Sequence, residues 1–149
     1  MKDSKTTQDA AIRAMEPSDY DDILVLWKSL PGMGLSSADE REKITAFLGR
    51  NPTTCLVAER EERIVGTVLG GWDGRRGYVY HLAVDEGLQE MGIGTALMDE
   101  VERQFHVLGA RRIHLMIYRD NTAWAFYEKR GWFFRDDKIS LMSKDLAKK

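Results

Sequence analysis

"LQEMGIGTALM", residues 88–98, places Gly92 and Gly94 at the point where an apolar helical pattern begins. Glycine inside a helix costs up to about 1 kcal/mol relative to alanine, so the pair needs a physical reason. One reason is a tight turn, and the other is a ligand that must approach the backbone closely. If the helix begins near Gly92, its first N–H groups lack helical partners and point to one place, at the positive end of the helix dipole. The stretch therefore predicts an anion site suited to a phosphate or pyrophosphate.

Hydrophobic periodicity on both sides of this stretch predicts alternating strands and helices. An apolar strand over 78–84 leads into it, and the helix that follows carries Leu97, Val101 and Leu108 on one face and ends at Gly109. The polar turn over 60–62 joins the expected strands 54–59 and 63–72, which predicts an antiparallel hairpin. The other strands are expected over 10–15, 54–59, 63–72, 111–118, 132–136 and 138–145, and the other helices over 18–30, 36–48 and 122–129.

The resulting order is β-α-α-β-β-β-α-β-α-β-β, which predicts a mixed sheet with helices, of the α/β or α+β class. No repeat, low-complexity segment or linker interrupts it. We expect a tail over 1–9 and one domain over 10–149, long enough to bury roughly 70% of its unfolded surface.

Composition excludes several classes of function. The formal net charge of −2 argues against electrostatic binding of nucleic acid or of an anionic membrane. Cys55 is the single cysteine, and His81, His106 and His114 lack the spacing of metal ligands, so we expect neither a disulfide nor a metal site. The polar N-terminus lacks the apolar run of a signal peptide, and no stretch approaches the ~20 apolar residues of a membrane span. The sequence favours a cytoplasmic protein.

Three phosphate-binding loops compete for residues 88–98. A P-loop requires Gly-Lys-Ser/Thr, but Gly94 is followed by Thr95 and Ala96. A dinucleotide fingerprint requires glycine or alanine where Leu97 stands, and an acid at the end of the next strand, where this chain has Tyr118. The third pattern, Q-x-x-G-x-G/A, is matched in full by residues 89–94.

With this pattern, the chain resembles the GNAT superfamily of N-acetyltransferases over nearly its whole length. The segment DNTAWAFYEKRGW, residues 120–132, is similar to that family's N-x-x-A-x-x-x-Y-E-x-x-G-F. The family's asparagine usually lies seven residues before the tyrosine. Asn121 lies six residues before Tyr127 and Asp120 lies seven before it, so either residue can fill that place.

The resemblance implies that acetyl-CoA is the co-substrate and that strand 78–84 splays from its parallel neighbour to admit it. The Leu82 N–H would polarise the thioester carbonyl, and Tyr127 would protonate the departing thiolate as general acid. Many members carry Arg or Lys where this chain has Glu90 and Met91, so the pyrophosphate faces an unfavourable charge here. The implied cofactor-binding residues are Leu82, Ala83, Val84, Gln89, Glu90, Met91, Gly92, Ile93, Gly94, Thr95, Asn121 and Tyr127.

The residues that would face the acceptor and remove its proton are less constrained. The candidates for the acceptor pocket are Trp27, Trp72, Asp73 and Tyr80, with core packing and turn formation as the alternative roles. Strand alternation places His81 on the opposite face from Tyr80 unless a bulge intervenes, which favours a hydrogen-bonded structural histidine. Water, Tyr80 and His81 all stay open as the general base.

The sequence thus predicts an N-acetyltransferase that moves the acetyl group of acetyl-CoA to a primary amine by direct attack. The acceptor is a small molecule or a peptide, and longer acyl groups stay open. A non-catalytic acyl-CoA-binding or regulatory module on the same fold is the alternative. Pairing of the C-terminal strands between two copies would give a homodimer.

Overall fold

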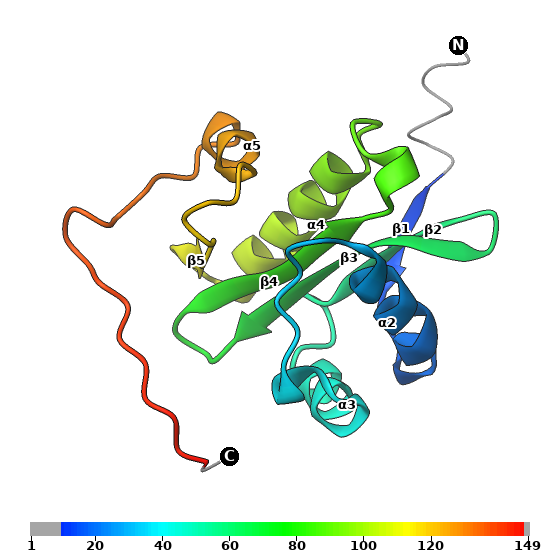
Figure 1. The fold of residues 1–149 in the computed structure, drawn as a ribbon, viewed down its shortest axis with the longest axis horizontal. Coiled ribbons are helices and arrows are strands. Elements are labelled where there is room, and N and C mark those ends of the chain that lie inside the picture. Colours follow the sequence, from blue (N-terminus) through cyan, green and yellow to red (C-terminus); the bar gives the residue numbers. More distant parts are fainter. Residues whose placement is uncertain (1–9, 148–149) are drawn as a thin grey trace. The chain divides into compact units, whose positions relative to one another are not determined.

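The computed structural model describes residues 10–147, and the chain forms two compact units that meet in sequence between Met116 and Ile117. Unit 1 contains the sheet and three α-helices, and unit 2 contains one short helix among its described residues (Figure 1). No helix within residues 10–147 is long and apolar enough to cross a membrane.

The sheet of unit 1 has five strands, in the order in which they occur along the chain. Neighbours pair antiparallel from β1 to β4, and β5 joins β4 in parallel. This confirms the predicted mixed sheet, which is mostly antiparallel. The strands are β1 Ala11–Ala14, β2 Leu56–Arg60, β3 Arg63–Trp72, β4 Gly77–Val84 and β5 Ile113–Leu115.

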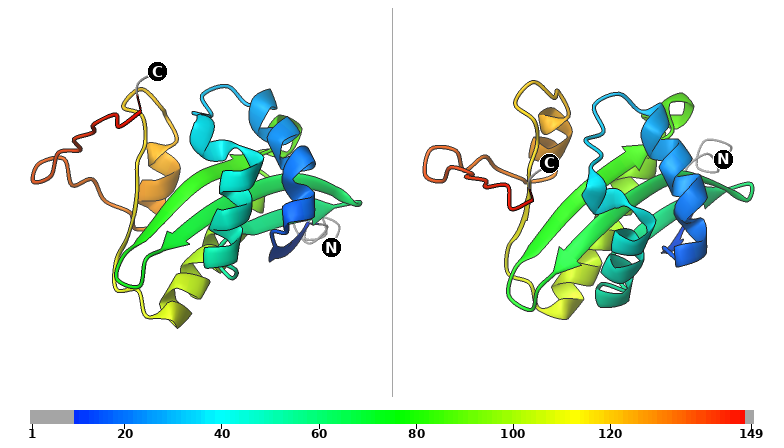
Figure 2. Two further views of the ribbon diagram at one scale, coloured as in Figure 1. Left: turned by 90° about the horizontal axis from the view of Figure 1, so that it is seen from below. Right: turned by 60° about the horizontal axis from the view of Figure 1, so that its bottom comes forward.

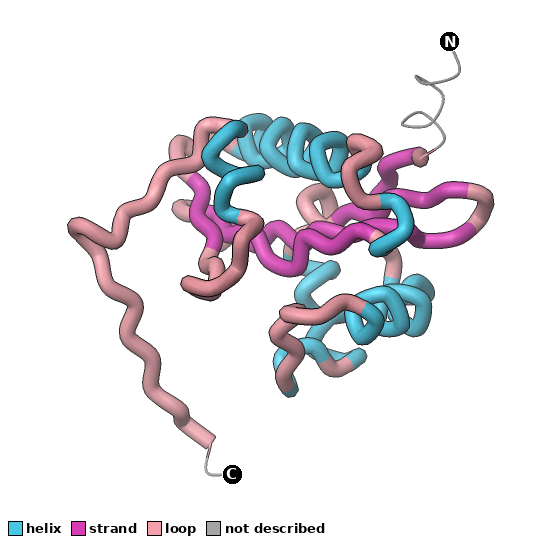
Figure 3. Tube along the Cα trace, turned by 45° about the horizontal axis from the view of Figure 1, so that its top comes forward, coloured by secondary structure: helices cyan, strands magenta, loops and turns pink. Residues whose placement is uncertain are grey.

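Helices cover both faces of this sheet (Figure 2). Two helices, α2 (Tyr20–Ser29) and α3 (Arg41–Arg50), lie on one face and α4 (Ile93–Leu108) lies on the other (Figure 3). Short 3₁₀ turns, η1 (Pro17–Asp19) and η2 (Ser37–Asp39), precede the first two helices. We call these surfaces the α2/α3 face and the α4 face.

The α4 face owes its packing to a four-residue apolar spacing along the helix. Ile93, Leu97, Val101 and Phe105 are all buried against the sheet. The expected helix face included Leu108 in place of Phe105, which is wrong because Leu108 is 40% exposed as the last helical residue. The Phe105 ring occupies space that glycines of the sheet leave free.

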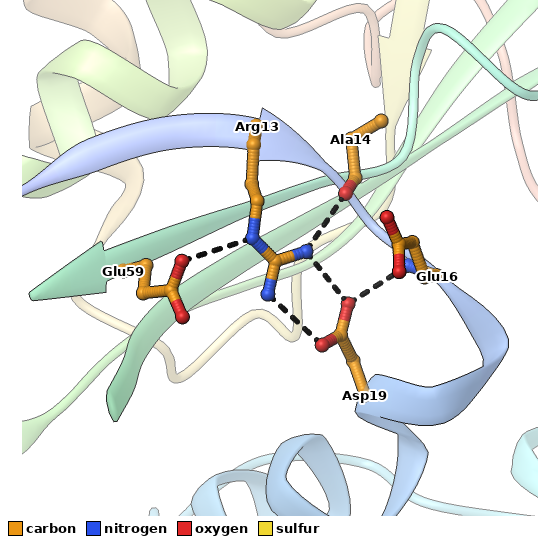
Figure 4. A network of polar contacts seen from close by, with 5 residues as sticks. All are labelled: Arg13, Ala14, Glu16, Asp19 and Glu59. Atoms are coloured by element: carbon orange, nitrogen blue, oxygen red, sulfur yellow. Dashed lines mark hydrogen bonds and ion pairs between the residues drawn. The ribbon is translucent and has the colours of Figure 1, made fainter. Parts of the chain in front are cut away.

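A cluster of ion pairs at Arg13 ties the first strand to its neighbours (Figure 4). The Arg13 guanidinium donates two hydrogen bonds to the Asp19 carboxylate, at 2.9 and 3.0 Å, and Nε donates to Glu59 at 3.0 Å. Asp19 Oδ2 also accepts the backbone N–H of Glu16 at 2.8 Å. Burial alone would raise the pKa of the Asp19 carboxyl, but the hydrogen bonds from Arg13 and Glu16 together lower it.

Unit 2 differs from the prediction. Its one helix among residues 117–147 is α5, Trp124–Lys129, and the strands expected over 132–136 and 138–145 are absent. The N–H groups of Lys138 and Ile139 both donate to Arg135 O and close a turn there. A strand requires a neighbour that takes its backbone groups, and the described part of unit 2 contains none. The apolar alternation over 138–145 is therefore strand-like in composition only, and Leu141 is 72% exposed.

Candidate functional site

The glycine stretch forms a turn between β4 and α4. The α4 helix begins at Ile93 after Gly92, whose φ of 89° is left-handed, so glycine is required at this position. Gly94 lies within the first helical turn and is not among the residues with positive φ, so the turn does not require it. Its lack of a side chain instead agrees with the close approach of a ligand.

Side chains before the helix hold this turn against the end of β4. Asp85 Oδ1 accepts the N–H of Gly87 at 2.9 Å, and the Gln89 side chain donates to Val84 O at 3.0 Å. Ala96 is the first residue whose N–H bonds within the helix, to Gly92 O at 3.0 Å. The N–H groups of Ile93, Gly94 and Thr95 therefore point outward at the helix N-terminus, and no acidic side chain occupies the first turn. This geometry is typical of an anion site.

β4 changes its pairing halfway along its length. β5 pairs with β4 only at Gly77, Tyr78 and Val79, whereas β3 continues to pair with β4 as far as Val84. Within the described residues, the second half of β4 therefore has a strand on one side only. A ligand with amide groups can bind such an edge in the manner of an added strand.

A bulge marks the place where this change occurs. Tyr80 pairs with Leu69 and Ala83 with Thr67, so two β4 residues, His81 and Leu82, stand opposite one residue of β3. His81 has a φ of 48°. The expected alternation is overturned here, because the extra residue lets Tyr80 and His81 both face α2 and α3. The expected hydrogen bond of His81 is present.

The partner of His81 is Asp39, which was not predicted from the sequence. Its Oδ1 lies 2.8 Å from His81 Nε2, and its Oδ2 accepts the N–H of Ser36 at 2.9 Å. Asp39 lies three residues after Ser36, which is the spacing of a capping box and was the available signal. The pairing with His81 joins residues 42 positions apart, which no local pattern indicates.

The four acceptor candidates lie in different surroundings. Trp27 is fully buried on the α2/α3 face, and its Nε1 donates to Thr67 at 2.9 Å. Trp72 contacts Phe105 of α4, with ring centroids 6.4 Å apart, and so lies on the opposite face. Tyr80 is 36% exposed and contacts Phe47 of α3. The structure therefore does not bring all four together.

Asp73 lies in the β3–β4 turn, as the Asp-Gly pair indicates. Its Oδ1 accepts the N–H groups of Arg76 and Arg75, each at 2.7 Å, and these hydrogen bonds lower the pKa of its carboxyl. Cys55 is buried one residue before β2, and this burial raises the pKa of its thiol to about 12, which argues against a thiolate nucleophile.

Unit 2 contains the remaining predicted residues. Asn121 Oδ1 accepts the N–H of Ala123 at 2.7 Å and so forms the turn that precedes α5. The ring of Tyr127 packs edge to face against Phe126 and Trp132, with centroids 5.2 and 5.9 Å away. Burial raises the pKa of Tyr127 to about 12, so its hydroxyl keeps its proton at neutral pH.

Comparison with known proteins agrees with this geometry. Residues 20–132 match the acetyltransferase (GNAT) family. A protein named as an acetyltransferase from Pectobacterium atrosepticum is 35% identical over 119 residues, which cover 79% of this chain and 84% of that relative.

Solved structures extend the likeness to the fold. PaiA N-acetyltransferase from Thermoplasma acidophilum, crystallised with coenzyme A, has a TM-score of 0.75 at 19% identity, covering 85% of this chain and 91% of its own. An aminoglycoside acetyltransferase from an uncultured soil sample, crystallised with sisomicin, has a TM-score of 0.73 at 18% identity, covering 94% and 98%. At these identities the structures show a common fold alone.

Proposed function

The chain belongs to the acetyltransferase (GNAT) family and is an acyltransferase, and from this premise we propose that it transfers the acetyl group of acetyl-CoA to a primary amine. The amine attacks the thioester carbon directly, a C–N bond forms, and collapse of the tetrahedral intermediate breaks the C–S bond. No covalent acetyl-enzyme is needed, in keeping with the inert environment of Cys55.

The observation that carries the proposal is the course of β4. This strand leaves β5 after Val79 and leads directly into the turn before the α4 N-terminus. An open strand edge suits the amides of pantetheine, and a helix N-terminus suits the pyrophosphate. The two features follow one another along the chain, as the two parts of CoA do. In the proposal, Leu82 to Val84 bind pantetheine and residues 89–95 bind the pyrophosphate.

Two groups act on the reacting atoms in this proposal. The N–H of Leu82, one of the two bulge residues, stabilises the oxyanion of the tetrahedral intermediate. The Tyr127 hydroxyl gives its proton to the departing thiolate. Burial raises the pKa of Tyr127 to about 12, so the group is protonated throughout the neutral range, as a general acid must be before it acts. Asn121 uses its side-chain oxygen within its own turn, so only its Nδ2 group is left to donate to pantetheine, with Asp120 as the alternative contact.

The test measures thiol release from acetyl-CoA with four amines: a peptide with a free N-terminus, an N-terminally blocked lysine peptide, spermidine and sisomicin. We expect thiol release with at least one amine, together with an acetylated product detected by mass spectrometry. Calorimetric binding of acetyl-CoA without turnover for any amine would favour the non-catalytic module. Absence of binding would reject both proposals.

Tyr127→Phe tests the general acid in the same assay. Turnover should fall at least about tenfold, while the dissociation constant for acetyl-CoA stays near that of the wild type. Tyr118→Phe is the matched control, because it removes a hydroxyl from an exposed tyrosine of the same unit. An unchanged turnover in Tyr127→Phe would remove this residue from the mechanism.

A further inference from the structure

A buried chain of hydrogen bonds on the α2/α3 face holds the β4 bulge. Trp27 Nε1 donates to Thr67 Oγ1 at 2.9 Å, and Thr67 Oγ1 donates to the backbone carbonyl of His81 at 3.0 Å. Trp27 and Thr67 are both fully buried. The backbone carbonyl of His81 is therefore held by Thr67 of β3, whose hydroxyl is in turn oriented by Trp27 of α2.

The conformation that they hold is unfavourable for a histidine. A residue with a side chain costs roughly 1 kcal/mol or more in the left-handed region, and the φ of His81 is 48°. Glycine or asparagine would adopt this φ with less strain. Strained residues that the surrounding structure holds in place cluster at functional sites. The position thus keeps an imidazole where backbone conformation alone would favour glycine or asparagine.

The imidazole itself is held in one orientation. Its Nε2 lies 2.8 Å from Asp39 Oδ1, its ring stands edge to face against Trp27 at 4.7 Å, and 16% of the His81 side chain is exposed. The Asp39 carboxylate is fixed in turn by the N–H of Ser36, and the Asp39 backbone carbonyl accepts the hydroxyl of Tyr20 at 2.7 Å. A carboxylate accepts only, so it selects the tautomer with hydrogen on Nε2 and leaves a lone pair on Nδ1.

We propose that His81 accepts the proton of the attacking amine at Nδ1, with Asp39 as the positioning residue that orients the ring and stabilises the imidazolium. This inference rests on the proposed acetyl transfer. As the C–N bond forms, the amine proton passes to Nδ1, while the thiolate released by C–S cleavage takes the Tyr127 proton. His81 then returns its proton to solvent, and the Tyr127 phenolate takes a proton back from solvent, so both groups are restored.

The placement supports a catalytic rather than a purely structural pairing. His81 directly precedes Leu82, whose N–H is the proposed oxyanion donor, in the half of β4 that has no β5 partner. Asp39 of η2 and Trp27 of α2 contact the ring, and Thr67 of β3 bonds to the backbone carbonyl of the same residue. Asp39 is the one charged group among these contacts.

Two variants at position 81 separate the base from the bulge. His81→Asn and His81→Gly both suit a positive φ, so the bulge should survive in each. We expect kcat to fall at least about thirtyfold in both while the acetyl-CoA dissociation constant changes less than about twofold. Added imidazole should restore part of the rate of His81→Gly. His106→Asn makes the same replacement at an exposed histidine of α4 and should leave kcat unchanged.

Asp39→Asn tests the positioning residue. It should lower kcat by about tenfold with little change in KM, because the hydrogen bond to Ser36 can be kept while the charge is lost. Nitrogen NMR of the His81 ring should show one tautomer, protonated at Nε2, in the wild type and a mixture in Asp39→Asn. A merely structural pairing would lower thermal stability without the tautomer-linked loss of kcat.

The outcomes distinguish this inference from the function on which it rests. A wild-type protein that binds acetyl-CoA and acetylates no amine overturns the proposed function and the inference with it. A wild-type protein that acetylates an amine, with kcat unchanged in folded His81→Asn and His81→Gly, overturns the inference alone. If both variants fail to fold, the wild-type NMR spectrum decides, because a ring protonated at Nδ1 rather than Nε2 contradicts the proposed tautomer.

Discussion

The two faces of the sheet are built differently. On the α4 face the contacts are apolar, and Gly66, Gly70 and Gly77 leave room for Leu97 and Phe105. On the α2/α3 face a polar chain runs through the apolar core, from Trp27 through Thr67 to His81 and Asp39. Close packing without polar groups gives stability, whereas a buried polar network specifies one arrangement of its members. The α4 face thus supports β4, and the α2/α3 face fixes the orientation of His81.

Gly70→Ala should give the largest effect, because it breaks the packing of the α4 face. An added Cβ would lie 2.7 Å from the backbone oxygen of Thr54 and 3.0 Å from Phe105, and the backbone contact cannot be relieved by a rotamer change. We expect a loss of roughly 3 kcal/mol in the free energy of unfolding, measured by chemical denaturation. Gly49→Ala is the matched control, since no atom lies within 4 Å of its added Cβ.

Gly49→Ala, in contrast, should raise the free energy of unfolding. Gly49 lies inside α3, where alanine is favoured by about 0.5–1 kcal/mol. Equal effects of Gly70→Ala and Gly49→Ala would contradict the view that glycines of β3 are required by close packing.

Trp27→Phe should give the second-largest loss in the free energy of unfolding, because it breaks the polar network of the α2/α3 face. It keeps an aromatic ring in the core but removes the donor to Thr67, so we expect a loss of about 2 kcal/mol. Trp124→Phe, at a residue 43% exposed, should change the free energy of unfolding by less than about 0.5 kcal/mol. The double variant with Thr67→Val measures the coupling, and additive losses would show that the hydrogen bond contributes nothing.

Arg13→Gln tests the ion pairs that lead into the α2/α3 face. Solvent screens this partly exposed cluster, so the loss at neutral pH should be about 1 kcal/mol. The folded-state pKa of Asp19 lies below its ordinary value of 3.8, so its contribution is present above pH 3.8 and disappears as the pH falls through the lowered value. The free energy of unfolding, measured by chemical denaturation, should therefore fall more between pH 6 and pH 3 in the wild type than in Arg13→Gln. Equal decreases in the two proteins would contradict this assignment.

Glu90→Arg, in the turn that precedes α4, should give the smallest effect. Glu90 is exposed, with a φ of 68°, two residues before the left-handed Gly92. Reversing its charge should tighten CoA binding about threefold, measured by calorimetry, because a positive charge replaces a negative one beside the proposed pyrophosphate site. The gain is small because backbone N–H groups would supply most of the contact in that proposal.

Glu62→Arg is the control for this change, with a similar φ of 64° in the β2–β3 turn. It makes the same charge change at a comparable backbone conformation outside the proposed site, and CoA affinity should not respond. An equal gain in both variants would show a general charge effect rather than a local one.

The two units differ in how far local patterns predicted them. In unit 1, the glycines at 92 and 109 mark the helix ends as expected, both with left-handed φ, and the hairpin turn lies at Glu61 and Glu62. In unit 2, the apolar alternation of 138–145 predicted a strand that is absent. A helix end depends on a few adjacent residues, whereas a strand depends on a partner that its own sequence does not contain.

The candidate site likewise contains features that local patterns predicted and features that they did not. The sequence by itself determined the left-handed turn before α4, the apolar spacing of that helix and the β4 strand that leads into it, because each follows from residues close together in the chain. Only the tertiary structure decided that β4 bulges at His81, that this ring meets Asp39 and that Trp27 and Trp72 lie on opposite faces. These features depend on pairing register and on contacts between residues up to 42 positions apart, which the packing of the whole sheet sets.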